Sequence, residues 1–321
     1  MTERIGVIGA GAFGTALAVA QASAGREVAL WARDAGAVAA MAEARENAAR
    51  LPGVNLPESI YPTADFGQAA RGIVFLAVPT QSLRKVLETH ENAISGSVLV
   101  ACCKGVELGT GLLPTEVIAD VLPDARAAVL TGPSFAADIA VGKPTALTLA
   151  ATGSGVEELQ EALSTRSLRL YLSDDLIGAQ LGGALKNVIA IAAGVTVGAG
   201  LGESARAALM TRGFAEMTRH AEARGADSET LHGLSGLGDL VLTCTSEKSR
   251  NYRHGLALGA GTPPPAGTTV EGVATARALA AAAPEDTLPV TSMVAALLDG
   301  RVTLEEAVEL LLTRPLKRER G

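Results

Sequence analysis

A lysine and an asparagine interrupt a strongly apolar stretch of the sequence that has helical spacing. Lys186 and Asn187 lie within the run GGALKNVIAI, where a buried ammonium costs free energy unless it has partners. Desolvation, or a second cation nearby, lowers the pKa of a lysine and suits it to proton transfer with a carbonyl oxygen. The alternative is a lysine whose head extends to the surface. The helix alone does not decide between the two.

Three further segments carry polar side chains that could act together with this lysine. Lys104 follows one expected strand, and the run TGPS, which begins at Thr131, follows the next. Both therefore lie at the edge where open α/β sheets bind ligands. The third segment contains Asp239 and is followed by the run SRN, which begins at Ser249. Asp239 could instead cap a helix, and Ser249 could cap a turn.

The run GAGAFG at residues 9–14 has the spacing G-x-G-x-x-G, between an expected strand and an alanine-rich helix. Gly9 permits a tight turn, Gly11 lets the backbone approach a pyrophosphate, and Gly14 permits close packing of helix and strand. An anion there would contact free N–H groups at the positive end of the helix. This context predicts a dinucleotide-binding loop.

The residues that follow the second expected strand bear on which dinucleotide is bound. An acidic residue about 20 positions beyond the glycines ordinarily binds the ribose 2′-hydroxyl, but Ala32 occupies that place and Arg33 follows it. Because Arg33 could pair with a 2′-phosphate, we expect NADP to be accepted as well as NAD. In the alternative, Arg33 is an ordinary surface residue and Asp34 binds the ribose.

The first half of the chain must supply the sheet that positions these groups. Apolar runs such as IVFLAV and SVLVA alternate with helical stretches, and they lack polar alternation, which is typical of parallel strands covered on both faces. We therefore predict an α/β protein with an N-terminal, Rossmann-type doubly wound sheet. The expected strands are residues 4–8, 27–31, 73–78, 97–101, 127–130, 145–150 and 168–172.

Beyond residue 173 the strand signal ends, and alanine- and leucine-rich stretches with helical spacing follow. We predict a dinucleotide-binding domain over residues 1–175 and an all-α substrate and catalytic domain over residues 176–321. The boundary is placed at Ser173-Asp174-Asp175, whose side chains suit a helix N-cap. The expected helices are residues 179–198, 203–224, 269–283, 289–298 and 303–312.

Composition and charge exclude several classes of protein. The chain is 48% hydrophobic and 19% charged, unlike a disordered protein, and its net charge of −7 does not favour nucleic acid as a partner. Its three cysteines form neither a disulfide framework nor a metal-binding pair, which indicates a reducing, cytoplasmic environment. The apolar run at residues 188–201 is shorter than the ~20 residues that cross a bilayer, so we expect no integral membrane segment.

The residues that commonly bind metals or act as nucleophiles show no suitable arrangement. The four histidines have no metal-ligand spacing, and Cys244 has no histidine nearby to act as its base. We therefore expect neither a metal site nor a thiol nucleophile.

The glycines, lysines and other polar residues considered above lie in conspicuous segments of the sequence. In order along the chain, seven such segments are GAGAFGTALA, LWARD, CCKGVE, TGPSFA, QLGGALKNVIAI, GLGDLVLTCTSEKSRN and VEG. In this order and spacing they resemble NAD(P)-dependent glycerol-3-phosphate dehydrogenase of the bacterial type. The resemblance extends from residue 5 to about residue 312, and the LKNV and GLGDLVLTC blocks are highly specific. The residues by themselves indicate only a two-domain nicotinamide dehydrogenase, and the substrate comes from the resemblance.

The resemblance implies a role for each matching residue. Lys186 matches the general acid/base, which protonates the carbonyl oxygen of dihydroxyacetone phosphate, and an arginine fork beside an amide suits a phosphate dianion. The implied substrate contacts are Lys104, Gly132, Ser134, Lys186, Asn187, Asp239, Thr243, Ser249, Arg250 and Asn251. The implied cofactor contacts are Gly9, Gly11, Ala12, Phe13, Gly14, Arg33, Lys104, Ala136, Arg250, Thr269 and Glu271. Thr269 stands where valine is more usual.

The implied activity is the reversible reduction of dihydroxyacetone phosphate to sn-glycerol 3-phosphate by NADH or NADPH, for glycerophospholipid synthesis. The resemblance also implies a homodimer. One alternative is a reductase of the same fold that acts on a 2- or 3-hydroxy acid, whose carboxylate would not need the run SRN at residues 249–251. The other is a non-catalytic nucleotide sensor, which would leave Lys186, Lys104 and Asp239 without a role.

Overall fold

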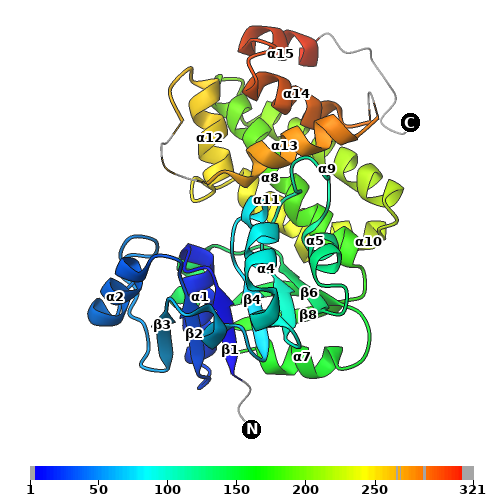
Figure 1. Ribbon diagram of the computed structural model, residues 1–321. Coiled ribbons are helices and arrows are strands. Elements are labelled where there is room, and N and C mark those ends of the chain that lie inside the picture. Colours follow the sequence, from blue (N-terminus) through cyan, green and yellow to red (C-terminus); the bar gives the residue numbers. More distant parts are fainter. Residues whose placement is uncertain (1–3, 265–266, 268, 285–286, 313–321) are drawn as a thin grey trace.

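The computed structural model describes residues 4–264, 267, 269–284 and 287–312, with the backbone alone for residues 310–312. A sheet with its covering helices forms one half of the molecule, and a group of helices forms the other (Figure 1). The strands are β1 (Ile5–Ile8), β2 (Val28–Trp31), β3 (Ile60–Thr63), β4 (Ile73–Leu76), β5 (Val98–Ala101), β6 (Arg126–Thr131), β7 (Thr145–Ala151) and β8 (Leu168–Ser173). The helices of this half are α1 (Ala12–Ala22), α2 (Ala35–Ala44), α3 (Phe66–Ala69), α4 (Thr80–Ile94), α5 (Pro114–Val121), α6 (Ala136–Ala140) and α7 (Val156–Leu163).

The eight strands lie in the order β3-β2-β1-β4-β5-β6-β7-β8. β1 pairs in parallel with both β2 and β4. Strands β2 and β3 therefore follow one another to one side of β1, and the chain then returns to place β4 on its other side. At such a point the loops that leave the strands diverge, and ligands bind between them. This arrangement confirms the predicted doubly wound, Rossmann-type sheet.

Two features of the sheet differ from the sequence prediction. β3 was missed, because it is a short edge strand that contains Pro62 and has only its two end residues buried. β7 pairs with β6 in antiparallel orientation, so the sheet is mostly rather than wholly parallel. The connection between these two strands contains only the five-residue α6, which packs on α1 instead of crossing the sheet.

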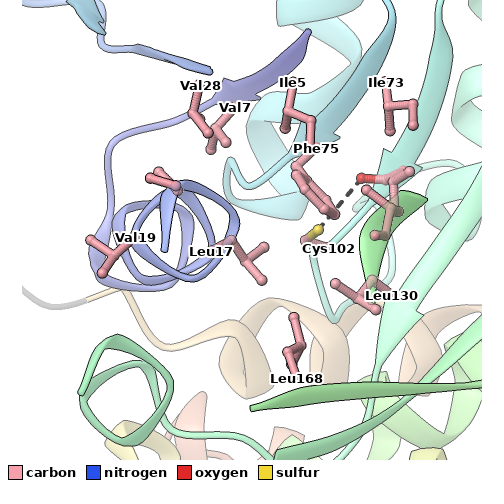
Figure 2. Close-up of a cluster of buried hydrophobic side chains, with 14 of the residues drawn as sticks. Ile5, Val7, Leu17, Val19, Val28, Ile73, Phe75, Cys102, Leu130 and Leu168 are labelled. Atoms are coloured by element: carbon pink, nitrogen blue, oxygen red, sulfur yellow. Dashed lines mark hydrogen bonds between the residues drawn. The ribbon is translucent and has the colours of Figure 1, made fainter. Parts of the chain in front are cut away.

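The central strands are buried on both faces, which explains their continuous apolar sequences. Val7 and Phe75 point to the face covered by α1, whereas Ile8 and Leu76 point to the face covered by α4 and α5. Figure 2 shows the first of these clusters, in which Leu17 of α1 lies against the strand side chains. The two-sided core fixes the carboxyl ends of the strands, where the polar segments begin.

The helical half is built around one long helix, α8, which is buried over most of its length. Asp175 caps α8, since its side chain accepts a hydrogen bond of 2.7 Å from Gly178 N, as the sequence predicted. The division into domains at residue 175 stays a prediction. The helices of this half are α8 (Leu176–Gly198), α9 (Glu203–Ala223), α10 (Ser228–His232), the π-helical turn η1 (Leu234–Gly238), α11 (Asp239–Cys244), α12 (Arg250–Gly259), α13 (Glu271–Ala282), α14 (Pro289–Leu298) and α15 (Leu304–Leu312).

Among the described residues, α8 is also the one helix that is long and apolar enough to cross a bilayer by length and composition. Of its most apolar 18-residue window, 83% is buried inside the protein. The apolar surface of α8 is therefore covered mostly by the other helices of this half and, near Ala179, by β6 and β7.

Glycines bring α12 unusually close to α8. A β-carbon at Gly194 of α8 would lie 2.2 Å from the carbonyl oxygen of Tyr252, and one at Gly255 of α12 would lie 2.0 Å from that of Ile191. Neither position can hold a larger residue unless the helices separate. Because Arg250 begins α12, this backbone contact fixes its position relative to the middle of α8.

Candidate active site

A buried ammonium group projects from the central helix of the helical half. Lys186 lies on α8, and its side chain is only 9% exposed. Its Nζ atom lies 3.1 Å from Oδ1 of Asp239 and donates a hydrogen bond of 2.8 Å to Oγ1 of Thr243. Asp239 and Thr243 are one turn apart on α11, so one short helix presents both partners.

A second ammonium group reaches the same carboxylate from the sheet. Lys104, which follows β5, donates hydrogen bonds of 2.7 Å to Oδ2 of Asp239 and 2.8 Å to the carbonyl oxygen of Gly132. The Asp239 carboxylate therefore lies between two cations, one from each half of the molecule. Asp239 is the first residue of α11, but its side chain faces these lysines and does not cap the helix.

The protonation states of these groups follow from burial and charge. Burial lowers the pKa of Lys186 to about 8, while the Asp239 carboxylate opposes this shift and the charge of Lys104 adds to it. Burial alone would raise the pKa of Asp239, but the two lysines hold it below its ordinary value. Asp239 is thus ionised near neutral pH, and Lys186 can both donate and accept a proton there.

Two buried asparagines join α8 to its neighbours. Asn187 donates through Nδ2 to the carbonyl oxygens of Lys104, at 3.0 Å, and Gly183, at 3.3 Å. Asn251 of α12 donates to Oδ1 of Asn187 at 2.8 Å and accepts a hydrogen bond from Gly272 N at 3.0 Å. These amides therefore hold α8, α12, α13 and the Lys104 segment in register, and a direct contact of either with substrate stays a prediction.

The run SRN lies where α12 begins. Ser249 is the N-cap of α12 and accepts a hydrogen bond of 3.2 Å from Tyr252 N, so it caps a helix and not the turn considered as its alternative. Its contact with substrate stays a prediction. The side chain of Arg250 is exposed, and its positive charge reaches Glu271 on α13. Burial nonetheless raises the pKa of Glu271, whose Oε1 accepts a hydrogen bond of 3.3 Å from Thr80 N. Thr269 is exposed just before α13.

The segment after β6 completes the surroundings of Lys104. Gly132 has a φ of +128°, which favours glycine, and Ser134 donates a hydrogen bond of 3.2 Å to the carbonyl oxygen of Gly132. Thr131 is 2% exposed, and its hydroxyl has no partner among the residues that the structure describes. Thr131 was not among the residues predicted from the sequence to form the site. Its position at the carboxyl end of β6, directly before the predicted Gly132, could have pointed to it.

The dinucleotide loop, residues 9–14, has the form that its glycines predict. Gly9 has a φ of +112°, and a β-carbon there would lie 2.8 Å from the carbonyl oxygen of Ala77. A β-carbon at Gly14 would lie 2.1 Å from the carbonyl oxygen of Gly9. A β-carbon at Gly11 would meet nothing within 4 Å, so open space lies above the start of α1. The absence of a side chain at Gly11 leaves this space open, as close approach of a pyrophosphate requires.

Three of the expected cofactor contacts gather where α6 packs on the start of α1. Ala12 and Phe13 of α1 and Ala136 of α6 are half-buried around the cluster formed by Ala16 and Ile139. The packing of α6 on α1 therefore brings a segment that follows β6 next to the dinucleotide loop. Their contact with a cofactor stays a prediction.

Arg33, the expected partner of a 2′-phosphate, and Asp34, the alternative partner of the ribose, have different surroundings. Asp34 is the N-cap of α2 and accepts a hydrogen bond of 2.8 Å from Ala37 N. The side chain of Arg33 is exposed. Asp34 therefore already has a structural partner, and Arg33 extends into solvent at the end of β2.

The cysteines and histidines have no evident role in this site. All three cysteines are free thiols, and burial raises the pKa of Cys244 to about 12, which disfavours the thiolate. Within residues 4–264, 267, 269–284 and 287–312, no three histidine, cysteine or acidic residues form a group that could hold a metal ion.

Comparisons with known proteins agree over almost the whole chain. Residues 4–156 match the family model for the N-terminus of NAD-dependent glycerol-3-phosphate dehydrogenase, and residues 175–309 match the model for its C-terminus. A glycerol-3-phosphate dehydrogenase [NAD(P)+] of Cereibacter sphaeroides is 58% identical over 98% of this chain and 100% of its own. A relative of the same name from Roseobacter denitrificans is 55% identical over 98% of this chain and 99% of its own.

A solved structure shows the same arrangement of the chain. The crystal structure of glycerol-3-phosphate dehydrogenase from Coxiella burnetii has a TM-score of 0.93 and 36% sequence identity, and it covers 98% of this chain and 99% of its own. The yeast glycerol-3-phosphate dehydrogenase structure has a TM-score of 0.82 at 21% identity over 97% of this chain and 99% of its own, which shows a shared fold.

Proposed function

The chain belongs to the NAD-dependent glycerol-3-phosphate dehydrogenase family, and we propose on this premise how its site performs the reaction. It is an NAD(P)-dependent oxidoreductase that interconverts dihydroxyacetone phosphate and sn-glycerol 3-phosphate, the backbone of glycerophospholipids. The observation that carries the assignment of roles is the buried Lys186, which is held by Asp239 and Thr243 and faces a second cation, Lys104.

The dinucleotide loop and its neighbours are the proposed cofactor site. Gly9, Gly11 and Gly14 shape the loop, and the N–H groups at the start of α1 face the space above Gly11 that suits a pyrophosphate. When bound, the nicotinamide supplies the hydride in reduction and accepts it in oxidation. The other proposed contacts are Ala12, Phe13, Arg33, Lys104, Ala136, Arg250, Thr269 and Glu271.

Lys186 is the proposed acid in reduction and the base in oxidation. In reduction, its ammonium gives a proton to the carbonyl oxygen of the substrate as that oxygen gains negative charge. Lys104 adds a second positive charge that stabilises the same oxygen, and Asp239 keeps both ammonium groups oriented. Burial strengthens these interactions because little water competes for the groups.

Arg250 is the proposed phosphate ligand, since it is a guanidinium fork on the rigid start of α12. Ser249 caps the same helix, so its first contribution is to fix the orientation of Arg250. The phosphate would also meet the partial positive charge at the helix N-terminus. The other proposed substrate contacts are Gly132, Ser134, Asn187, Thr243 and Asn251.

The substrate assignment is tested by following the absorbance of NADPH during turnover. Dihydroxyacetone phosphate is compared with a panel of 2-keto acids at equal concentration. We expect oxidation of NADPH with dihydroxyacetone phosphate and little with the keto acids, because these lack the phosphate that Arg250 binds. Turnover of a keto acid alone would instead identify a hydroxy acid reductase of the same fold.

The pH dependence of catalysis should follow the titration of Lys186. Reduction requires the ammonium form, so its kcat should fall as pH rises through about 8, whereas oxidation requires the amine and should rise over the same range. The negative charge of Asp239 raises the pKa of Lys186, so Asp239→Asn should move both midpoints to lower pH. The measurement is kcat in both directions between about pH 6 and pH 10. Midpoints that move upward in the variant would contradict this assignment.

Arg33 is proposed to bind the 2′-phosphate of NADPH. Removing its side chain should therefore cost the free energy of one charged contact. Arg33→Ala should weaken use of NADPH by about 1–3 kcal/mol in kcat/KM and leave NADH nearly unchanged. Asp34→Asn keeps the cap of α2, so it distinguishes the alternative in which Asp34 binds the ribose. Equal losses of both cofactors in Arg33→Ala would exclude the proposed role of Arg33, and a selective loss of NADH efficiency in Asp34→Asn would show that Asp34 binds the ribose.

We also propose that the protein is a homodimer, as the sequence resemblance implies, and that it is cytoplasmic, as its cysteine content indicates. The three free thiols support a reducing compartment. Light scattering during size-exclusion chromatography would give the mass of the particle, and a single-chain mass would contradict the dimer.

A further inference from the structure

A surface ion pair connects the two halves of the molecule beside the proposed site. Lys248 lies in the turn between α11 and α12, and its Nζ atom lies 3.3 Å from each carboxylate oxygen of Asp138 on α6. The same ammonium lies 5.6 Å from the centre of the Phe135 ring, just before α6. Lys248 thus makes two contacts with one short segment of the opposite half.

Both ends of this pair are attached to functional elements. In the turn, Lys248 N donates to Oγ of Ser246 at 3.2 Å, and Ser249 N donates to the carbonyl oxygen of Ser246 at 3.0 Å. Lys248 is therefore held in a fixed turn directly before the cap of α12 and the proposed phosphate ligand Arg250. On the other side, Ile139 buries α6 against α1, so Asp138 is fixed relative to the dinucleotide loop.

Other ion pairs also cross between the halves, at different places. Within the described part of the chain they are Lys104 with Asp239, inside the site, and Arg224 with Glu116 at 2.9 Å, where the end of α9 meets the start of α5. Neither one ties the start of α12 to α6. The ion pair of Asp138 and Lys248 makes that connection, and it is separate from the site lysines, Lys104 and Lys186.

We propose that the ion pair between Asp138 and Lys248 is a positioning pair, which holds the Arg250 turn against the dinucleotide half while substrate is bound. The proposal rests on the proposed function, because it assigns Arg250 to the substrate phosphate. An enzyme that encloses its substrate between two such halves must open them to release product. The pair has to break for that opening, so its strength contributes to substrate affinity.

The size of the effect follows from the exposure of the pair. The Lys248 side chain is 54% exposed and that of Asp138 is 26% exposed, so water and salt weaken their attraction. Pairs of this kind change an equilibrium by about two- to fivefold. We expect Lys248→Met, which removes the charge and keeps an unbranched side chain of similar length, to raise KM for dihydroxyacetone phosphate by about that factor without lowering kcat.

The chain offers a matched control on the same carboxylate. Lys143 lies 2.8 Å from Oδ1 of Asp138, but it belongs to the same half as Asp138 and does not cross to α12. Lys143→Met should therefore leave KM unchanged. Asp138→Asn should raise KM in the same direction as Lys248→Met, and the double variant should be no worse than Lys248→Met alone. Lys248→Arg keeps the charge and should retain the KM of the unaltered enzyme.

Equal effects of Lys143→Met and Lys248→Met on KM would overturn the proposal. They would show that KM depends on the net charge around α6 and not on the connection between the halves. Additive effects in the double variant would also overturn it, since two residues that act through one pair cannot add. A rise in salt should increase KM less in Lys248→Met than in the unaltered enzyme, because the screened pair is already absent. An equal increase would contradict the proposal.

A measurement without turnover separates this proposal from the proposed function. Trypsin cleaves after an accessible lysine, and the pair with Asp138 restrains Lys248. Mass spectrometry should detect faster cleavage between Lys248 and Ser249 in Asp138→Asn than in the unaltered protein, with no change in Lys143→Met. If no turnover of dihydroxyacetone phosphate occurs but this difference is present, the proposed function fails while the connection between the halves stands. If the cleavage rates are equal, the pair does not hold the turn.

Discussion

Lys186→Met should lower kcat for reduction of dihydroxyacetone phosphate by at least the ~10²–10⁴-fold that a positioned general acid contributes. Methionine fills a similar volume, so α8 should stay packed, but it has no proton to give. The Asp239 carboxylate would keep Lys104 as its remaining cation. The dinucleotide loop lies in the other half of the molecule, so cofactor affinity should change little. Stopped-flow measurement of NADPH oxidation, with titration of NADPH fluorescence for binding, checks both expectations.

Lys85→Met is the matched control, because Lys85 is an exposed lysine on α4 and lies outside the proposed site. It should retain full activity. If Lys186→Met keeps a tenth or more of kcat, Lys186 is not the acid. If it also loses NADPH affinity, the variant has disturbed the fold, and an unfolding curve would then separate the two effects.

Arg250→Ala should raise KM for dihydroxyacetone phosphate by roughly tenfold to a few hundredfold. A hydrogen bond to an ionised group contributes ~1.5–3 kcal/mol, and a bidentate one should reach or exceed the upper end of that range. The loss should depend on the phosphate, so turnover of unphosphorylated dihydroxyacetone should hardly change. The measurement is kcat/KM for both substrates at constant ionic strength, because salt weakens the attraction between exposed charges.

The exposed Arg212 on α9 provides the control for loss of a positive charge, and Arg212→Ala should leave both substrates unaffected. Equal losses on the two substrates in Arg250→Ala would place Arg250 away from the phosphate. Arg250 also faces Glu271, so its loss should further raise the pKa of that carboxyl. A rise in KM for NADPH in the same variant would support the second proposed role of Arg250, as a cofactor contact.

Local sequence determined the features that depend on the backbone of a few consecutive residues. The dinucleotide loop could be predicted because Gly9 needs a positive φ and Gly14 leaves no room for a side chain. The cap at Asp175 could be predicted because its hydrogen bond with Gly178 N lies within three residues of the same segment. The buried strands were recognised because their residues are apolar at successive positions. β3 was missed for the converse reason, since its short run contains Pro62 and carries little of that signal.

Only the tertiary structure decided what the polar residues of the site contact. Asp239 is 135 positions from Lys104 and 53 from Lys186, and nothing local showed that its carboxylate joins the two cations instead of capping α11. Ser249, in contrast to Asp239, does cap its own helix. Sequence could name Asn187 as polar within an apolar helix, but not its bond to Asn251.

The physical reason for this division is the range of the interactions. A glycine turn or a helix cap depends on steric limits and hydrogen bonds within about four residues, which the sequence displays directly. The pKa of Lys186 instead depends on burial by other helices and on charges brought from the opposite half. The close contact of α8 with α12 and the packing of α6 on α1 set those distances. The chain therefore carries its reactive groups in its sequence, but they become a site only when the two halves pack together.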